Sequence, residues 1–192
     1  MDYPVVSSSQ EILWMSAVPL SVASLALGVI ANNAVDTKEI YARMQKPFFA
    51  PPAYMFGIVW TILHITMPIA YWLARTANIL KDDYESATIF LYGILMVSLP
   101  VWSLLFFVKK QLSLSFVWII ATVIIAITTT LVFGLQGGSV PFLLMAPLCV
   151  WTAFAASLNG SIMMNNVTIA ERENGVVRHV IVPLHQSGRK RK

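Results

Sequence analysis

Five long apolar stretches contain none of the chain's charged residues, and this feature constrains the fold more than any other. The chain has 192 residues, of which 13 are Lys or Arg and 9 are Asp or Glu. About 20 consecutive apolar residues in a helix cross the hydrocarbon core of a bilayer, and each stretch has 20 to 23 residues. The sequence therefore predicts five transmembrane spans, at about residues 12–31, 53–74, 87–108, 113–134 and 141–163.

The spans predict an all-α fold. In hydrocarbon only helices and closed barrels satisfy their own backbone hydrogen bonds. The apolar runs are continuous rather than alternating, which excludes a barrel. Charged residues make up 11% of the chain, against about 25% in a typical soluble domain. We therefore predict an integral membrane bundle of five helices over residues 1–165, followed by a basic, flexible cytosolic tail over residues 166–192.

Basic residues are concentrated on one side of the predicted bundle. The side with the N-terminus, the loop 75–86 and the loop 135–140 carries two of them. The side with the loop 32–52, the turn 109–112 and the tail carries the other eleven. Because cytoplasmic loops are enriched in Lys and Arg, we expect a multi-pass protein with a cytosolic C-terminus.

The chain ends in Arg-Lys-Arg-Lys at residues 189–192, and three interpretations of this ending remain open. It could attract anionic lipid headgroups, serve as a sorting signal, or be a solvated end without a partner. The solvated end is the interpretation that the sequence favours.

The spans lack the residues that most catalytic sites require. They contain no Asp, Glu, Lys or Arg, and the sequence has no paired carboxylates, no Cys/His cluster with metal-ligand spacing and no phosphate-binding loop. His64 is the one side chain in the spans whose ordinary pKa is near neutrality, and a packing hydrogen bond is a better hypothesis for it than a proton relay. We therefore predict no catalytic residue, no metal site, no required cofactor and no nucleic-acid partner. An apolar, aromatic-lined pocket for a small molecule remains.

Three deep tryptophans favour such a pocket. Trp60, Trp102 and Trp151 lie well inside their spans. A buried indole N–H needs a hydrogen-bond partner, and lipid tails offer none. We therefore expect these side chains to face neighbouring helices or a cavity.

The connector between the first two spans is long, and its end is rich in proline. Residues 46–52 read Lys-Pro-Phe-Phe-Ala-Pro-Pro. Residues that precede proline favour extended backbone, and long loops in compact proteins are often lids or binding elements. This segment, here called the strap, is therefore either a lid or a simple connector, and the residues alone favour neither.

Three motifs, in order along the chain, resemble the signature of the translocator protein family, also called tryptophan-rich sensory proteins. They are KPFFAPPAYMFGIVWTIL at residues 46–63, WSLLFF at residues 102–107 and PLCVWTAFAASLN at residues 147–159. The resemblance extends over about residues 12–165. It implies a five-helix bundle with a ligand cavity that opens towards the cytosolic side under the first loop.

The resemblance also implies ligands and site residues. Members of the family bind porphyrins and haem, cholesterol in animals, and synthetic drugs, and many are homodimers. The positions that match the family's cavity and strap, or lie beside them in the motifs, form our candidate ligand site. They are Pro51, Pro52, Tyr54, Phe56, Trp60, His64, Trp102, Phe106, Trp151, Phe154, Ala155, Leu158 and Asn159.

The chain departs from the family pattern at several positions. Tyr54 stands where a tryptophan is usual, and His64 where a tyrosine is usual. Leu99 replaces an asparagine, which removes a polar group from the expected cavity. Residues 160–166 contain neither the tyrosine nor the basic residue of the animal sterol motif.

We therefore predict a membrane receptor or carrier that binds tetrapyrroles (porphyrin or haem) and related apolar ligands such as sterols, with a role in tetrapyrrole handling or stress response. Trp60 and Trp151 would stack on the ligand, because aromatic faces favour flat partners. The alternatives are a transporter of such ligands and a non-catalytic interaction protein; light-dependent porphyrin breakdown is a secondary hypothesis. By resemblance, the membrane would be the mitochondrial outer membrane or the secretory pathway in a eukaryote, and the cell envelope in a bacterium.

Overall fold

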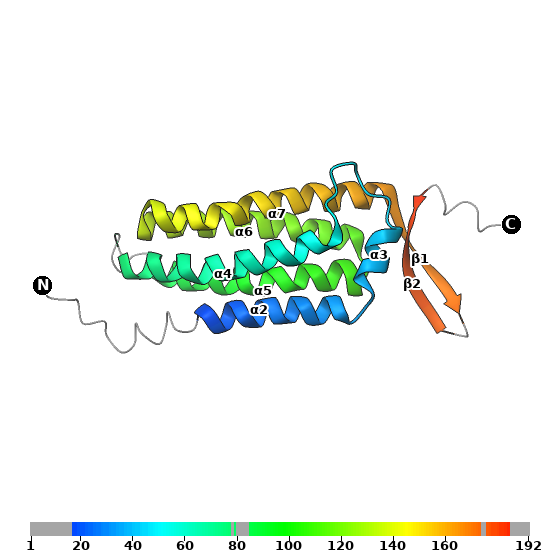
Figure 1. The fold of residues 1–192 in the computed structure, drawn as a ribbon, viewed down its shortest axis with the longest axis horizontal. Helices are drawn as coiled ribbons and strands as arrows, with labels where there is room; N and C mark the ends of the chain where they lie inside the picture. Colours follow the sequence, from blue (N-terminus) through cyan, green and yellow to red (C-terminus); the bar gives the residue numbers. More distant parts are fainter. Residues whose placement is uncertain (1–16, 78, 80–84, 174–175, 185–192) are drawn as a thin grey trace, which may run out of the picture.

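Five long helices lie side by side in the computed structural model, which describes residues 17–77, 79, 85–173 and 176–184. Figure 1 shows them as an elongated bundle, with α2 starting at the end opposite to the short helix α3 and the β-hairpin. The helices are α2 (Ala17–Asn33), α4 (Ala53–Ala77), α5 (Glu85–Ser103), α6 (Leu112–Gly137) and α7 (Ser139–Asn165). The predicted helical membrane bundle is confirmed.

Four of these helices are long and apolar enough to cross a membrane, in the part of the chain that the structure describes. The number rises to five if α2 and α3 (Thr37–Arg43), whose axes differ by 66°, are counted as one span. Residues 12–16 of the predicted first span lie outside the described residues. The described part of this span, α2, has 17 residues and continues two residues beyond the predicted end at Ala31.

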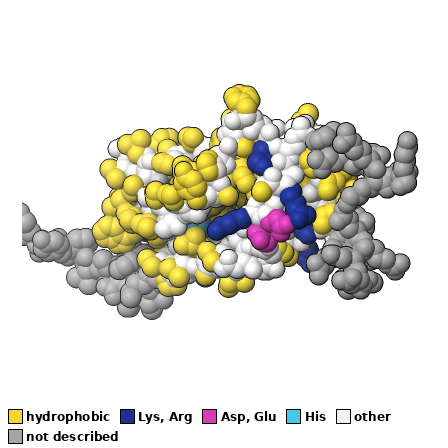
Figure 2. Space-filling model, turned by 45° about the vertical axis from the view of Figure 1, so that its right-hand side comes forward, with side chains coloured by type: hydrophobic (Ala, Val, Ile, Leu, Met, Phe, Trp, Pro, Cys, Tyr) yellow, Lys and Arg dark blue, Asp and Glu magenta, His cyan; other side chains and the backbone are white. Residues whose placement is uncertain are grey.

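Apolar side chains cover the outside of the bundle, and hydroxyl groups lie inside it. Ile65, Ile124 and Val150 are 58%, 61% and 71% exposed, and Figure 2 shows hydrophobic side chains over much of one face. The buried hydroxyl of Thr122 donates to the carbonyl of Trp118 in its own helix, and that of Thr152 donates to the carbonyl of Leu148. This arrangement suits a lipid environment, in which polar side chains face other helices.

A π-helix, η2 (Leu104–Val108), continues α5. The N–H of Lys109 donates to the carbonyl of Leu104, five residues earlier, at 2.9 Å. Short π-helical segments are frequent at functional sites. This one holds Phe106 and begins two residues after Trp102, so it contains one predicted site residue and adjoins another.

A β-hairpin follows α7, in the first part of the segment for which the sequence predicted a flexible tail. Strands β1 (Asn166–Glu173) and β2 (Val176–Pro183) pair antiparallel, with Asn166 opposite Pro183 and Glu173 opposite Val176. The physical reason is that β2 is rich in Val and Ile, which favour strands, and that Ile181 is buried in the bundle's core. The Asn-Gly pair at 174–175 in the sequence is a strong hairpin signal that could have indicated this pairing. Residues 185–192 lie outside the described residues.

The core has two parts along the bundle. One is centred on Leu63, Met67, Tyr71, Tyr92 and Phe133. The other lies at the end that carries α3 and the hairpin, and contains Tyr41, Trp102, Phe106, Leu158, Ile162 and Ile181. Four predicted site residues lie in this second part, namely Trp102, Phe106, Ala155 and Leu158. Trp60 and Trp151 pack against the first part.

Candidate functional site: two adjoining cavities

A cavity of about 130 Å³ lies between α2, α4 and α5. Two glycines help to form it, because a Cβ added at Gly28 or Gly57 would meet no atom within 4 Å. Phe56, Trp60 and His64 line it from one side of α4. The facing residues are Ser24, Leu25, Val29 and Asn32 on α2 and Leu99, Pro100 and Ser103 at the end of α5.

A second, smaller cavity of about 20 Å³ adjoins the first. Phe56 lines both cavities and therefore stands between them. The other residues around the second cavity are Tyr41, Trp102, Phe106, Phe107, Ala155, Leu158, Asn159 and Ile162. Five of these are predicted site residues, so the sequence-derived set is divided between two neighbouring spaces.

Aromatic rings connect the two cavities to the strap. The Trp151 ring packs edge-to-face on Trp60 and on Phe56, with centroid separations of 6.4 and 5.7 Å. It also stacks on Phe154 at 5.4 Å with an interplanar angle of 29°. Phe154 in turn contacts Phe49 of the strap at 6.0 Å. Trp151 and Phe154 thus contact the cavity walls without lining either space.

Several buried polar atoms near these cavities have no partner among the described residues. They include the indole nitrogens of Trp102 and Trp151 and the side-chain oxygen of Asn32. Buried polar groups in folded proteins are nearly always hydrogen-bonded, so each such atom requires an explanation. A ligand that carries both acceptors and a donor would satisfy these groups.

His64 makes a packing hydrogen bond, as the sequence favoured. Its Nδ1 lies 2.8 Å from the carbonyl oxygen of Trp60, which can only accept, so Nδ1–H is the donor. Nε2 then accepts from the hydroxyl of Ser24 on α2, at 3.2 Å. The imidazole therefore ties α2 to α4 at the edge of the larger cavity.

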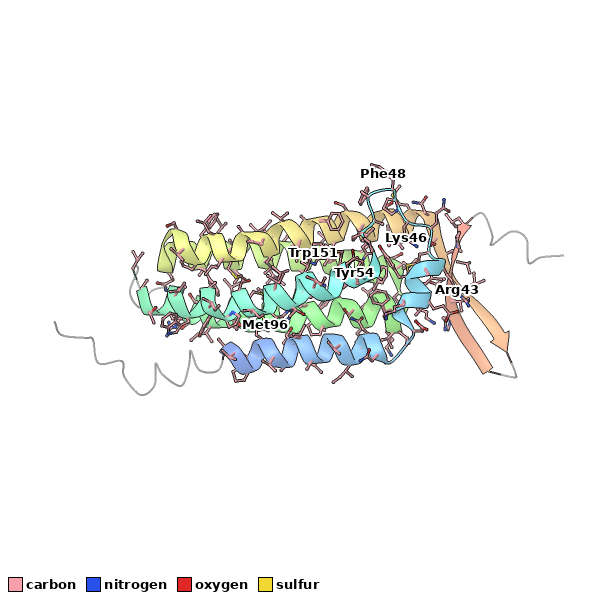
Figure 3. All side chains as sticks on the ribbon, viewed as in Figure 1. Arg43, Lys46, Phe48, Tyr54, Met96 and Trp151 are labelled. Carbon is pink, nitrogen blue, oxygen red and sulfur yellow. The ribbon has the colours of Figure 1, made fainter. Side chains whose placement is uncertain are left out.

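Hydrogen bonds from Tyr41 of α3 and from Lys46 of the strap join these two segments. The Tyr41 hydroxyl donates to the Pro51 carbonyl at 2.9 Å. The Lys46 ammonium lies 4.9 Å from the centre of the Tyr41 ring and donates to the carbonyls of Tyr41 and Met44. Partial burial lowers the pKa of Lys46 and raises the pKa of Tyr41. These contacts hold the strap at the α3 end of the bundle, where Figure 3 labels Lys46 and Phe48.

The side chain of Asn166 bonds Gln45, the residue directly before the strap, although the two residues are 121 positions apart in the sequence. Its Oδ1 accepts from the N–H of Gln45 at 2.9 Å, and its Nδ2 donates to the carbonyls of Gln45 and Ile162 at 2.9 and 2.8 Å. The residue is 4% exposed. Here this pair of bonds between Gln45 and Asn166 is called the Asn166 clamp.

The remaining predicted residues lie at different depths. Asn159 is buried and donates to the Ser115 hydroxyl on α6 at 3.3 Å, beside the smaller cavity. Tyr54 is 66% exposed and lines neither cavity. Pro51 accepts the bond from Tyr41, and Pro52 is exposed on the strap. Leu99 lines the larger cavity, so this wall lacks the polar side chain that the asparagine of the family pattern would provide.

None of the predicted site residues lies on α2, yet this helix forms a wall of the larger cavity. Ser24, Gly28 and Asn32 contribute from one face of the helix, at four-residue spacing. Residues four apart lie on the same side of an α-helix. This row of small and polar residues within an apolar helix is the feature by which the sequence could have indicated that α2 lines a cavity.

Comparisons with known proteins agree on one family. The family model described as "TspO/MBR family" matches residues 16–164. The chain is 34% identical over 146 residues to the "Tryptophan-rich protein TspO" of Archaeoglobus fulgidus, covering 75% of this chain and 92% of that protein. It is 25% identical over 156 residues to the "Translocator protein" of Sus scrofa, covering 80% of this chain and 91% of that protein.

These matches and the apolar helices support an integral, multi-pass membrane protein with a receptor-like or transporter-like role. The matched region contains α2 to α7 and both cavities, and it ends before the hairpin. The chain therefore belongs to the TspO/MBR family.

Proposed function

We propose that this protein is a membrane receptor or carrier that binds planar, largely apolar ligands, tetrapyrroles in particular, at the two adjoining cavities. The observation that carries the proposal is the set of unpartnered buried polar atoms, on Trp102, Trp151 and Asn32, beside aromatic walls. A site that presents indole donors and flat apolar faces matches a flat ligand with acceptor groups at its edge.

The chemistry of a porphyrin fits this description. Its macrocycle is flat and apolar and would lie against Trp60 and Phe56, with Trp151 supporting both rings from α7. Its carboxylates are hydrogen-bond acceptors, which indole N–H groups can satisfy. Sterols share the apolar body and carry one hydroxyl, so they would satisfy fewer of these polar atoms.

The cavities must widen before such a ligand enters. The larger one measures about 130 Å³, whereas drug-sized ligands occupy pockets of roughly 300–1,000 Å³. Rotation of Phe56 would join the two spaces, because this ring lines both. Lifting the strap would release Phe49 from Phe154 and open the end of the bundle. In this proposal the strap acts as the lid of the site.

Titration with protoporphyrin tests the proposal. Binding to the purified protein should quench tryptophan fluorescence at micromolar ligand. Trp151→Phe removes an indole donor and part of a stacked ring, and should weaken the affinity about tenfold. Trp72→Phe is the matched control, because Trp72 is 43% exposed and lines neither cavity. Absence of quenching in the unaltered protein, or equal affinities for the two variants, would reject the proposal.

A second pair of variants tests the place of binding. Gly57→Leu would fill the larger cavity without a clash at Cβ. Gly93→Leu places the same side chain on α5, again with no atom within 4 Å of the added Cβ and away from both cavities. Protoporphyrin binding should fall in the first variant only, while both retain their helical circular dichroism. Full binding in Gly57→Leu would move the site elsewhere.

One observation favours the transporter alternative. An apolar groove of about 530 Å³ lies on the outer surface between α2 and α4, lined by Val18, Val22, Ile65 and Trp72 among others. His64 lines both this groove and the larger cavity. A ligand dissolved in the bilayer would therefore reach the cavity past one side chain. Porphyrin flux into sealed liposomes that contain the protein would support transport, whereas flux equal to that of empty liposomes would leave only the receptor role.

A further inference from the structure

We propose that a groove at the end of the bundle, between the α5–α6 turn and the β-hairpin, binds the phosphate-bearing headgroup of an anionic membrane lipid. The groove measures about 580 Å³ and shares no residue with the two cavities. The turn contributes Lys109 and Lys110, and the hairpin contributes Thr168 and His179. The proposal is therefore independent of the ligand site.

Two lysines give the described part of the groove a positive charge. Among the residues that the structure describes, no Asp or Glu lines it. Lys109 is exposed, and among the described residues its ammonium has neither an ion pair nor a hydrogen bond. A basic side chain near a bilayer surface attracts anionic lipid with about 1 kcal/mol. Two adjacent lysines thus favour an anion in this position.

The groove is held in shape by bonds between the turn and the hairpin. The Thr168 hydroxyl donates to the carbonyl of Lys110 at 2.7 Å, and the Lys110 ammonium donates to the carbonyl of His179. Lys110 adopts a φ of 53°, which is uncommon for a residue other than glycine. A binding site that is already formed does not lose ordering entropy when its ligand arrives.

The start of α6 adds to the positive potential. No acidic residue lies in its first turn, and the Gln111 side chain makes no capping hydrogen bond. The first N–H groups of a helix lack intrahelical partners and carry the positive end of the helix dipole. These groups belong to residues that line the groove next to the two lysines.

The apolar part of the groove selects a lipid rather than a free phosphate. Leu112, Leu114 and Met163 line it together with the lysines, and Leu114 is 47% exposed. From there α6 continues as a membrane span whose Val117 is 64% exposed. A headgroup at the lysines would therefore place its acyl chain along the outer surface of α6, in the bilayer.

Native mass spectrometry of the full chain, released from micelles with equal amounts of phosphatidylglycerol and phosphatidylcholine, tests the proposal. The protein should retain phosphatidylglycerol in preference. Replacing both Lys109 and Lys110 by Gln should weaken this retention roughly thirtyfold, the effect of two basic side chains near the surface. Lys38→Gln is the control for loss of a basic side chain outside the groove, because Lys38 is exposed on α3 at the same end of the bundle and does not line the groove.

A charge-retaining variant separates loss of binding from loss of folding. Replacing Lys109 and Lys110 by Arg should preserve lipid retention, and all variants should melt within a few degrees of the unaltered protein. Equal retention in the double Gln variant and in Lys38→Gln would overturn the proposal, as would equal binding of the two lipids. Displacement of the lipid by an excess of inorganic phosphate would show a site for free anions and reject a lipid site.

Discussion

Asn166 joins parts of the chain that lie far apart in sequence. Its side-chain amide bonds both backbone groups of Gln45, 121 residues away, and one carbonyl of α7. The strap, whose Phe49 contacts Phe154, begins directly after Gln45. A single side chain thus fixes the position from which the strap extends.

Asn166→Ala should free the strap and destabilise the protein. The substitution removes three hydrogen bonds from a buried position, each worth about 1 kcal/mol net, and leaves the N–H of Gln45 without its partner. We expect the free energy of unfolding to fall by about 2–3 kcal/mol. Hydrogen exchange at the Gln45 amide should accelerate, and detergent-solubilised protein should melt at a lower temperature.

Asn165→Ala is the control for this prediction. Among the described residues, the neighbouring amide bonds only Ser161, within its own helix turn. Its loss should leave exchange at Gln45 unchanged. If both alanine variants behave alike, the Asn166 clamp does not hold the strap.

The candidate site residues differ in how far the sequence could indicate them. It drew attention to Trp60, Trp102 and Trp151, because large aromatic residues with an N–H group are easily recognised within apolar helices, and Trp60 and Trp102 line the two cavities. It did not reveal that Phe56 stands between two cavities, or that Tyr54 lies outside both. Those positions depend on the direction of each side chain, which is set by neighbouring helices.

Helix packing in the bundle depends on small residues at a few contacts. Gly137, near the end of α6, is one of them. A Cβ added there would lie 2.6 Å from the Cα of Ala74 on α4 and 2.5 Å from Cγ of Pro141 on α7. Small residues let helix backbones approach closely in membranes. Gly137 therefore fixes where three helices meet.

Gly137→Ala should destabilise the bundle although alanine favours helices. The added methyl group meets backbone that cannot turn away, and overpacking of this kind costs about 1–3 kcal/mol. Thermal unfolding in detergent micelles, followed by circular dichroism, should show a lower melting temperature.

Gly93→Ala provides the matched comparison on α5. A Cβ at this position meets no atom within 4 Å. The higher helix propensity of alanine should leave stability unchanged or raise it by up to about 1 kcal/mol. A melting temperature that falls equally in both variants would show that close approach at Gly137 does not matter.

The connecting segments that are rich in Lys and Arg lie at one end of the molecule. The α5–α6 turn bonds the hairpin through Lys110, and α3 lies at the same end of the bundle (Figure 1). Eleven of the 13 Lys and Arg residues belong to these connecting segments and the tail. The positive-inside rule then predicts that this end faces the cytosol.

Cysteine labelling in intact cells that carry the protein in their plasma membrane tests this orientation. The single cysteine, Cys149, is first replaced by Ser. In that background Ser187→Cys, in the tail, should react with a membrane-impermeant maleimide only after permeabilisation, because the cytosol is closed to the reagent. Ser8→Cys, near the N-terminus, should react without permeabilisation. The reverse pattern would contradict the prediction.

The sequence by itself determined the environment and the family of this protein. A bilayer demands long helices free of charge, and this is a local property that can be read along the chain. The motifs at 46–63, 102–107 and 147–159 are equally local, and the family match over residues 16–164 confirmed them.

Only the tertiary structure decided how these parts form a site. The division of the cavity by Phe56, the wall from α2 and the Asn166 clamp all arise from contacts between distant segments. The hairpin contacts the bundle through Ile181, which is buried in the core. In an apolar solvent nearly every face of a helix is apolar, so hydrophobic periodicity alone does not indicate which face meets a neighbour; packing does.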